Sequence, residues 1–150
     1  MKLSIERLQA EAEATGFRAE VLEKVIHLLP VAPRPERYDP LEEKHFDREW
    51  TRRLGQSGKD CYAAILAKDA PALGASMNEC MRCWEAILPC TVRHAAIRMD
   101  LVSLLQLYQS KYVGAMYSGC GGGYLYIVSE ESVPGSLHVT VRTAPSGREY

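Results

Sequence analysis

The apolar residues of the first 29 positions recur at the three- and four-residue spacing of an amphipathic helix. Ser4 is a suitable N-cap for a first helix, and a Thr-Gly dipeptide interrupts the pattern before a second helix begins. Proline lacks the backbone N–H that a helix interior needs, so Pro30 should end the second helix after Leu29. The pattern therefore predicts a helical N-terminal segment over residues 1–29.

The next eleven positions, residues 30–40, contain prolines at 30, 33, 35 and 40. This spacing excludes a helix and favours extended, polyproline-like backbone. We expect a linker that leads into a domain over residues 41–145. A stiff surface loop within one domain is the alternative. Residues 146–150 are expected to be a frayed tail.

Three helical patterns follow the prolines. Asp47–Lys68 reads as two short helices with a turn at Gly55 and a second N-cap at Ser57. Asp69–Leu88 reads as one longer helix, because a proline sits in its first turn and another follows its last residue. Ile97–Tyr112 repeats leucine and tyrosine at helical spacing and predicts a further helix.

Two strands are predicted near the end of the chain. Tyr124–Val128 is a short apolar run, and Leu137–Val141 alternates apolar with polar residues around one buried face. A Pro-Gly turn separates them. The expected fold class is α+β, with several helices laid on one face of a small antiparallel sheet.

Composition narrows the class of protein. Hydrophobic residues make up 47% of the 150 positions and charged residues 25%, which is ordinary for a soluble globular domain. The net charge of −1 argues against nucleic-acid or membrane binding through broad electrostatics. No apolar run is long enough to span a bilayer or resembles a signal peptide. Five cysteines without a secretory signal predict reduced thiols and a cytoplasmic location.

The segment Gly114–Tyr124 is the richest in possible chemistry. Four of the five residues from Gly119 to Gly123 are glycine, and an apolar strand pattern follows directly. Glycine adopts positive φ and permits close backbone approach. The segment is thus either a tight hairpin turn or a concave nest of amides that binds an anion.

The same segment resembles the third conserved motif of the GHMP small-molecule kinases, roughly Gly-Ala-Lys-x-Thr/Ser-Gly-Ala-Gly-Gly-Gly. Residues 114–115, 118–119 and 121–123 match, whereas Met116 replaces the usual lysine and Cys120 the usual alanine. The resemblance extends at lower resolution back to about Val31, and sugar and sugar-phosphate kinases are the most similar. It implies the ferredoxin-like C-terminal domain of such a kinase. The substrate or phosphate loop that it implies consists of Ser118, Gly119, Cys120, Gly121, Gly122 and Gly123.

The resemblance also implies what this chain lacks. The family's second glycine-rich motif, which cradles the triphosphate at a helix N-terminus, has no counterpart, and no catalytic acidic residue can be assigned. We therefore expect no catalytic residue and no kinase activity from the chain alone. ATP and magnesium would bind only if a separately encoded N-terminal half were present. Such a half, or a second copy of the chain, is the expected partner.

A second hypothesis is a small protein-interaction module stabilised by zinc or by thiols. Cys80 and Cys83 lie one helical turn apart, and Cys90 and His94 follow, so four soft ligands are available for tetrahedral zinc. The surrounding sequence is strongly helical, however, and a free cysteine packs well as a small hydrophobe. Core packing is therefore the favoured interpretation of these cysteines.

A third hypothesis concerns the N-terminal segment. Residues 1–29 resemble the opening of AbiEii-type nucleotidyltransferase toxins, with a similar helix, Thr-Gly turn and Val-Leu-Glu-Lys-Val run. The catalytic Gly-Gly-Thr and paired aspartates of those toxins do not follow. This resemblance implies at most a helical adaptor that binds a protein partner.

Overall fold

The computed structural model describes residues 19–140. The predictions for residues 1–18, for the tail 146–150 and for Val141 lie outside this range. The described chain contains, in order, α2 Ala19–Val25, β1 Ile26–Ala32, α3 Arg48–Ala67, α4 Ala70–Ile87, the 3-10 helix η1 Pro89–Thr91, α5 Leu101–Lys111, β2 Gly114–Tyr117, β3 Gly123–Val128 and β4 Leu137–His138.

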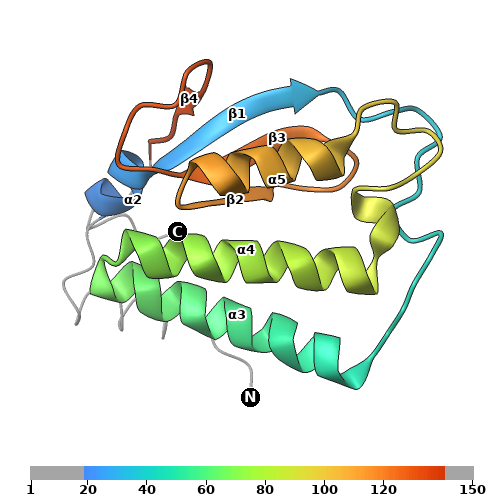
Figure 1. Cartoon of the computed structure of the whole chain (residues 1–150), viewed down its shortest axis with the longest axis horizontal. Coiled ribbons are helices and arrows are strands. Elements are labelled where there is room, and N and C mark those ends of the chain that lie inside the picture. Colours follow the sequence, from blue (N-terminus) through green and yellow to red (C-terminus); the bar gives the residue numbers. More distant parts are fainter. Residues whose placement is uncertain (1–18, 141–150) are drawn as a thin grey trace, which may run out of the picture.

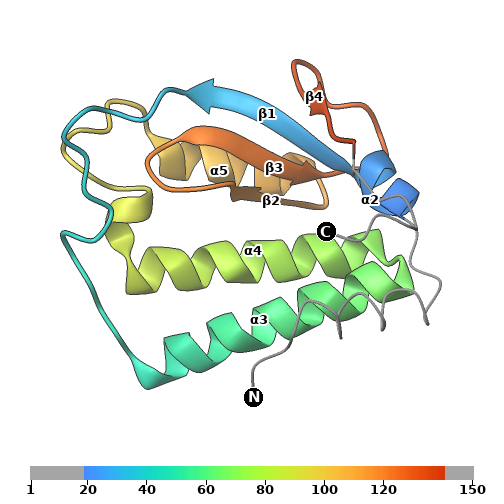
Figure 2. The same ribbon diagram turned by 180° about the vertical axis from the view of Figure 1, so that it is seen from behind.

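The helices are packed on a four-stranded antiparallel sheet, so the predicted α+β class is confirmed. Helix α5 covers one face of the sheet, α4 runs alongside β2, and α3 lies outside α4 (Figure 1). Seen from behind, no described helix lies in front of β1 (Figure 2). Helix α5 therefore covers one sheet face. On the other face, Val128 is buried against residues of α3 and α4, with Tyr126 and Met116 packed beside it. Among the described residues, the rest of this second face, around Tyr124 and Leu137, is exposed, and we call it the open face.

The strand order is β2-β3-β1-β4, with β1 and β3 in the centre. Leu28 of β1 pairs with Tyr126 of β3 on one side and with Leu137 of β4 on the other. Because side chains alternate across a strand, Leu125 and Ile127 point to the opposite face, where they are fully buried beneath α5. That face contains the main core.

The prediction of a helix up to Leu29 is wrong, because Ile26–Ala32 forms the central strand β1. An apolar run of this length fits a buried strand as well as a helix, and its pairing with β3 decides between them. Pro30 lies within the strand, next to the irregularity in register between Pro30 and Ala32, which is a position where a strand tolerates proline. The boundary drawn between residues 29 and 30 thus falls inside a strand.

The predicted turn at Gly55 is also wrong, because α3 is one continuous helix from Arg48 to Ala67. Ser57 is not an N-cap but a buried residue in the helix interior, where its hydroxyl donates to the carbonyl of Leu54. Asp47 is the N-cap as predicted and accepts from two backbone amides. Packing against α4 outweighs the helix cost of glycine.

Helix α4 agrees with its prediction at both ends. Asp69 accepts from the amide of Ala72, Pro71 lies in the first turn, and the helix ends at Ile87. It approaches β2 so closely that a Cβ on Gly74 would lie 2.6 Å from the carbonyl oxygen of Val113. The approach places α4 against the outer edge of the sheet.

Polar side chains form hydrogen bonds with the backbone groups of the strand at that edge. The amide of Ala115 in β2 donates to Oδ1 of Asn78 from α4, at 2.9 Å. The carbonyl of Ala115 accepts from Nε2 of Gln109 in α5, at 3.0 Å. An edge strand with its groups occupied in this way resists pairing with a further strand.

Helix α5 is shorter than predicted and begins at Leu101 rather than at Ile97. Asp100 is its N-cap, and hydrogen bonds from the amide and hydroxyl of Ser103 lower the pKa of the Asp100 carboxyl. Strand β3 agrees with its prediction, whereas β4 covers only Leu137–His138, and β2 was not predicted.

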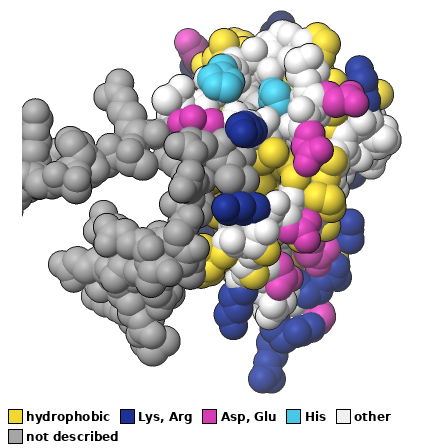
Figure 3. All heavy atoms as spheres, turned by 90° about the vertical axis from the view of Figure 1, so that its left-hand side faces the viewer, with side chains coloured by type: hydrophobic (Ala, Val, Ile, Leu, Met, Phe, Trp, Pro, Cys, Tyr) yellow, Lys and Arg dark blue, Asp and Glu magenta, His cyan; other side chains and the backbone are white. Residues whose placement is uncertain are grey.

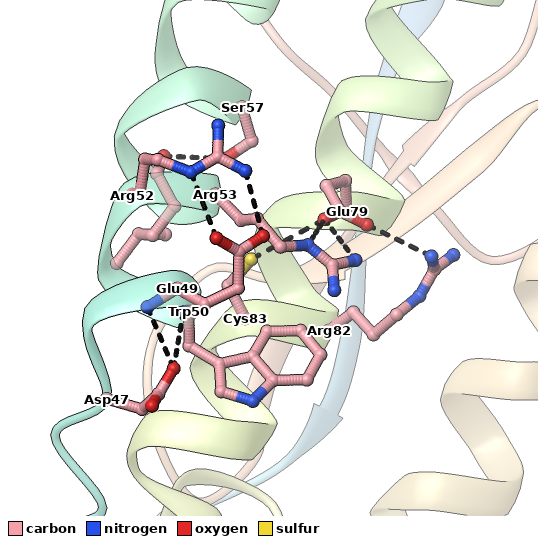
Figure 4. Close-up of polar contacts among 10 residues, drawn as sticks. Asp47, Glu49, Trp50, Arg52, Arg53, Ser57, Glu79, Arg82 and Cys83 are labelled. Carbon is pink, nitrogen blue, oxygen red and sulfur yellow. Dashed lines mark hydrogen bonds and ion pairs between the residues drawn. The ribbon is translucent and has the colours of Figure 1, made fainter.

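A polar network joins α3 to α4 on the outer side of the molecule (Figure 4). Glu79 of α4 accepts from Arg53 of α3 at 2.6 Å and from Arg82 at 3.0 Å. The guanidinium of Arg53 also lies 4.3 Å from the ring centroid of Trp50. The ion pairs and the cation–π contact help to hold α3 and α4 together.

Candidate functional site

The glycine-rich motif forms the loop between β2 and β3, at the right-hand end of the sheet in Figure 1. The amide of Ser118 donates to the carbonyl of Tyr124 at 3.0 Å and closes the hairpin. Gly121, Gly122 and Gly123 have φ values of 74°, 105° and 82°, a region that other L-residues rarely adopt. The local sequence is thus explained by the backbone path of the hairpin.

Gly121 is also a point of close packing. Its amide donates to the carbonyl of Thr91 in η1 at 2.8 Å. A Cβ on Gly121 would lie 2.5 Å from a ring carbon of Tyr38. The central amide of the motif therefore has an intramolecular acceptor and is not available to an anion.

The proline-rich residues 33–40, which we call the strap, lie against this loop. Nε of Arg34 donates to the carbonyl of Cys120 at 3.2 Å. The hydroxyl of Tyr38 donates to the carbonyl of Cys90 at 2.6 Å, and its ring meets His94 edge to face at 5.1 Å between centroids. These contacts are those of a surface segment packed within one domain.

The environment of Tyr38 keeps its hydroxyl protonated. Burial raises the pKa of Tyr38 to about 12, and the neighbouring thiols of Cys120 and Cys90 act in the same direction, while Arg34 opposes them. At neutral pH Tyr38 is therefore a hydrogen-bond donor that anchors the strap, and it is unsuited to act as a general base.

A hollow of about 350 Å³ opens beside the loop. Its walls come from three parts of the fold, namely α4 with η1, strand β2 and the glycine loop. The lining residues are Met81, Trp84, Leu88, Thr91, Met116, Tyr117, Ser118, Gly119 and Cys120. The volume suits a small ligand, and the surface is almost wholly apolar.

The four residues of the zinc hypothesis do not assemble. Within residues 19–140 no group of three or more His, Cys, Asp or Glu residues could hold a metal ion. Cys83 is buried in α4, and burial raises the pKa of both Cys80 and Cys83, which disfavours the thiolate that zinc needs. His94 donates from Nε2 to Glu42 at 2.6 Å and accepts at Nδ1 from the amide of Ala96.

A second hollow, of about 410 Å³, lies at the opposite end of the sheet. Its apolar walls include Leu22, Val25, Ile65 and Leu73, from α2, α3 and α4. On this end of the molecule, apolar side chains lie among interspersed acidic and basic ones (Figure 3). Charged residues also line this hollow, namely Lys24, Lys68, Asp69 and Glu130.

Arg34, Tyr38 and Trp84 are the residues of the site that sequence reasoning missed. Arg34 and Tyr38 stood in the predicted linker, and Trp84 lay within the predicted helix Asp69–Leu88, where it is 36% exposed. The sequence held one usable signal. The prolines exclude a helix over residues 30–40, yet the segment contains an arginine and a tyrosine, which a plain spacer does not need.

Comparisons with protein-family models, with curated proteins and with solved structures gave no match. None of the helices within residues 19–140 has the length and apolar character needed to cross a membrane.

Proposed function

We propose that this chain is the C-terminal, substrate-pocket domain of a GHMP-type small-molecule kinase of the sugar or sugar-phosphate class. The observation that carries the proposal is the place of the motif. Residues 118–123 form a hairpin loop that borders a ligand-sized hollow, in a small antiparallel sheet covered by helices. A motif that resembles a substrate loop is thus next to a space for a substrate.

The sheet supports the same proposal. Central β1 and β3, flanked by β4 and β2, give the strand order of a ferredoxin-like sheet. The connection from β3 to β4 over residues 129–136 contains no helix, so the second crossover helix of that fold is missing. The chain is therefore like the ferredoxin-like fold in its strand order and in the connection from β1 to β2, but not in the connection from β3 to β4.

The described residues do not fit ATP and magnesium. The three long helices α3, α4 and α5 each begin with an aspartate whose carboxylate accepts from the first amides. These carboxylates, Asp47, Asp69 and Asp100, occupy the amides and repel the phosphates that an uncapped helix N-terminus would attract. Nucleotide binding would have to come from residues outside this domain, such as a partner half, and the described residues alone would be inactive.

The open face of the sheet offers a place for that second polypeptide. Leu28, Tyr126 and Leu137 lie in one row across β1, β3 and β4, and the adjacent pair Pro30 and Tyr124 extends it. Leu137 is 50% exposed and Tyr124 43%. Apolar residues so exposed on one sheet face are typical of a surface that a partner covers.

Complementation tests the proposal. The chain is mixed with ATP-binding halves prepared from GHMP sugar and sugar-phosphate kinases, and ADP release is measured with a panel of small-molecule acceptors. We expect no ADP release from the chain alone and substrate-dependent release from a matching pair. Tyr124→Asp, on the open face, should abolish the restored activity. Leu107→Asp, at a leucine on α5 that is 59% exposed, should leave it intact. Failure of every half to bind would refute the proposal.

A further inference from the structure

The hollow beside the glycine loop has few groups that could serve a sugar. A sugar ring presents several hydroxyls, and each one buried without a partner costs free energy. No Asp, Glu, Asn, Gln, Lys or Arg lines this hollow. The hydroxyl of Thr91 already donates to the carbonyl of Leu88. The walls formed by Met81, Trp84 and Met116 suit an apolar group instead.

The glycine loop that borders the hollow has a different character. Arg34 does not line the hollow, but its Nε donates to the carbonyl of Cys120, and a Cβ on Gly119 would lie 3.5 Å from its Nη2; both loop residues belong to the lining. Arg34 forms no ion pair with any carboxylate of residues 19–140. The amides of Gly119 and Cys120 donate to no oxygen in the same part of the chain.

These groups together favour a negatively charged ligand. Arginine presents a planar fork of donors that matches phosphate, and free backbone amides add further donors. The lysine that the motif would place at position 116 is a methionine here, and its side chain forms part of the apolar wall. Arg34, which arrives from the strap, supplies a cation at the loop in its place.

We propose that this hollow binds a phosphate monoester whose organic part is apolar, with the phosphate on Arg34 and the loop amides and the organic part against Trp84 and Met116. The inference rests on the proposed function for the choice of phosphate. It replaces the sugar part of the substrate named there with a less polar organic group, because the lining of the hollow does not suit a sugar.

Two monoesters of equal charge test the proposal. Phenyl phosphate and glucose 1-phosphate are titrated into the ¹⁵N-labelled chain, and shifts of the Gly119 and Cys120 amides and of the Trp84 indole N–H are followed by NMR. We expect phenyl phosphate to shift all three signals and to bind at least about tenfold more tightly than glucose 1-phosphate. Equal or tighter binding of glucose 1-phosphate would overturn the proposal, as would the absence of phenyl phosphate binding.

Variants separate the two halves of the site. Arg34→Gln should weaken phenyl phosphate about tenfold and leave the weaker binding of phenol unchanged. Arg37→Gln removes the same charge from the same strap, at a residue with no described contact to the loop, and should change neither. Equal effects of the two substitutions would overturn the role of Arg34. Because this assay needs no ATP-binding half, its failure is distinguishable from a failure of complementation.

Discussion

The packing of the strap on the glycine loop gives the sharpest test of the structure, because two glycines with similar positive φ values differ in their surroundings. Gly121 and Gly123 have φ values of 74° and 82°. Alanine in this left-handed region costs about 1–2 kcal/mol at either position. The gain from a stiffer unfolded chain is also common to both. The difference between the two substitutions therefore reports only what their Cβ atoms meet.

A Cβ on Gly121 would lie 2.5, 2.8 and 3.0 Å from three ring carbons of Tyr38, whereas one on Gly123 would meet nothing within 4 Å. The Tyr38 ring cannot simply swing aside, because its hydroxyl is bonded to Cys90 and its edge contacts His94. Overpacking of this kind costs about 1–3 kcal/mol. We expect Gly121→Ala to lower the free energy of unfolding by about 1–3 kcal/mol more than Gly123→Ala.

The assay is urea denaturation followed by circular dichroism, with each variant compared at the same slope. Adding Tyr38→Ala should restore part of the stability lost in Gly121→Ala, with a coupling of about 0.5–3 kcal/mol. Equal costs for the two glycines, or strict additivity with Tyr38→Ala, would refute the packing of the strap on the loop.

Three further predictions use the same equilibrium assay. Gly74→Ala should lower the free energy of unfolding by at least about 1–3 kcal/mol, because its Cβ would overlap backbone atoms of Val113. Gly55→Ala, in open space on α3, should instead raise it by about 0.5–1 kcal/mol. A gain in stability at both positions would contradict the close approach of α4 to β2. Asp69→Ala should cost about 0.5–2 kcal/mol and Asp69→Asn much less, since an amide oxygen still caps the helix; equal losses would contradict the capping role. The pKa of Tyr38 is raised in the folded state, from 10.0 to about 12. The contribution of this residue to stability is therefore complete below pH 10 and should disappear as the pH rises through 12. Tyr38→Phe should make this alkaline loss of stability smaller, and an unchanged pH profile would contradict the burial of the hydroxyl.

The elements that the sequence predicted well are those with local signals. Asp69, Pro71 and the proline after Leu88 determine both ends of α4 within a few residues, and the structure has the helix there. Asp47 similarly marks the start of α3. Capping and proline effects act over one turn, so they can be recognised without any knowledge of the fold.

Strand β1 could not be predicted in this way. Its apolar run fits a helix or a buried strand, and the choice depends on pairing between Leu28 and Tyr126, which are far apart in the sequence. The same holds for the site. The glycines indicated a loop, but Arg34, Tyr38 and Thr91 reach that loop only through the fold, and no periodicity or spacing connects them with it.

The positions of the glycines then limit what the motif itself can say about function. Gly121 is accounted for by its bond to Thr91 and its contact with Tyr38, and Gly122 and Gly123 by their positive φ values. Three matches to a phosphate-loop pattern can therefore arise from packing alone. Packing contacts and positive φ values do not explain the remaining two residues of the loop, Gly119 and Cys120. Their amides lack partners within the described chain and lie beside the Arg34 guanidinium. An anion site within the glycine loop would use these two amides, which is why Arg34 rather than the glycine count matters for binding there.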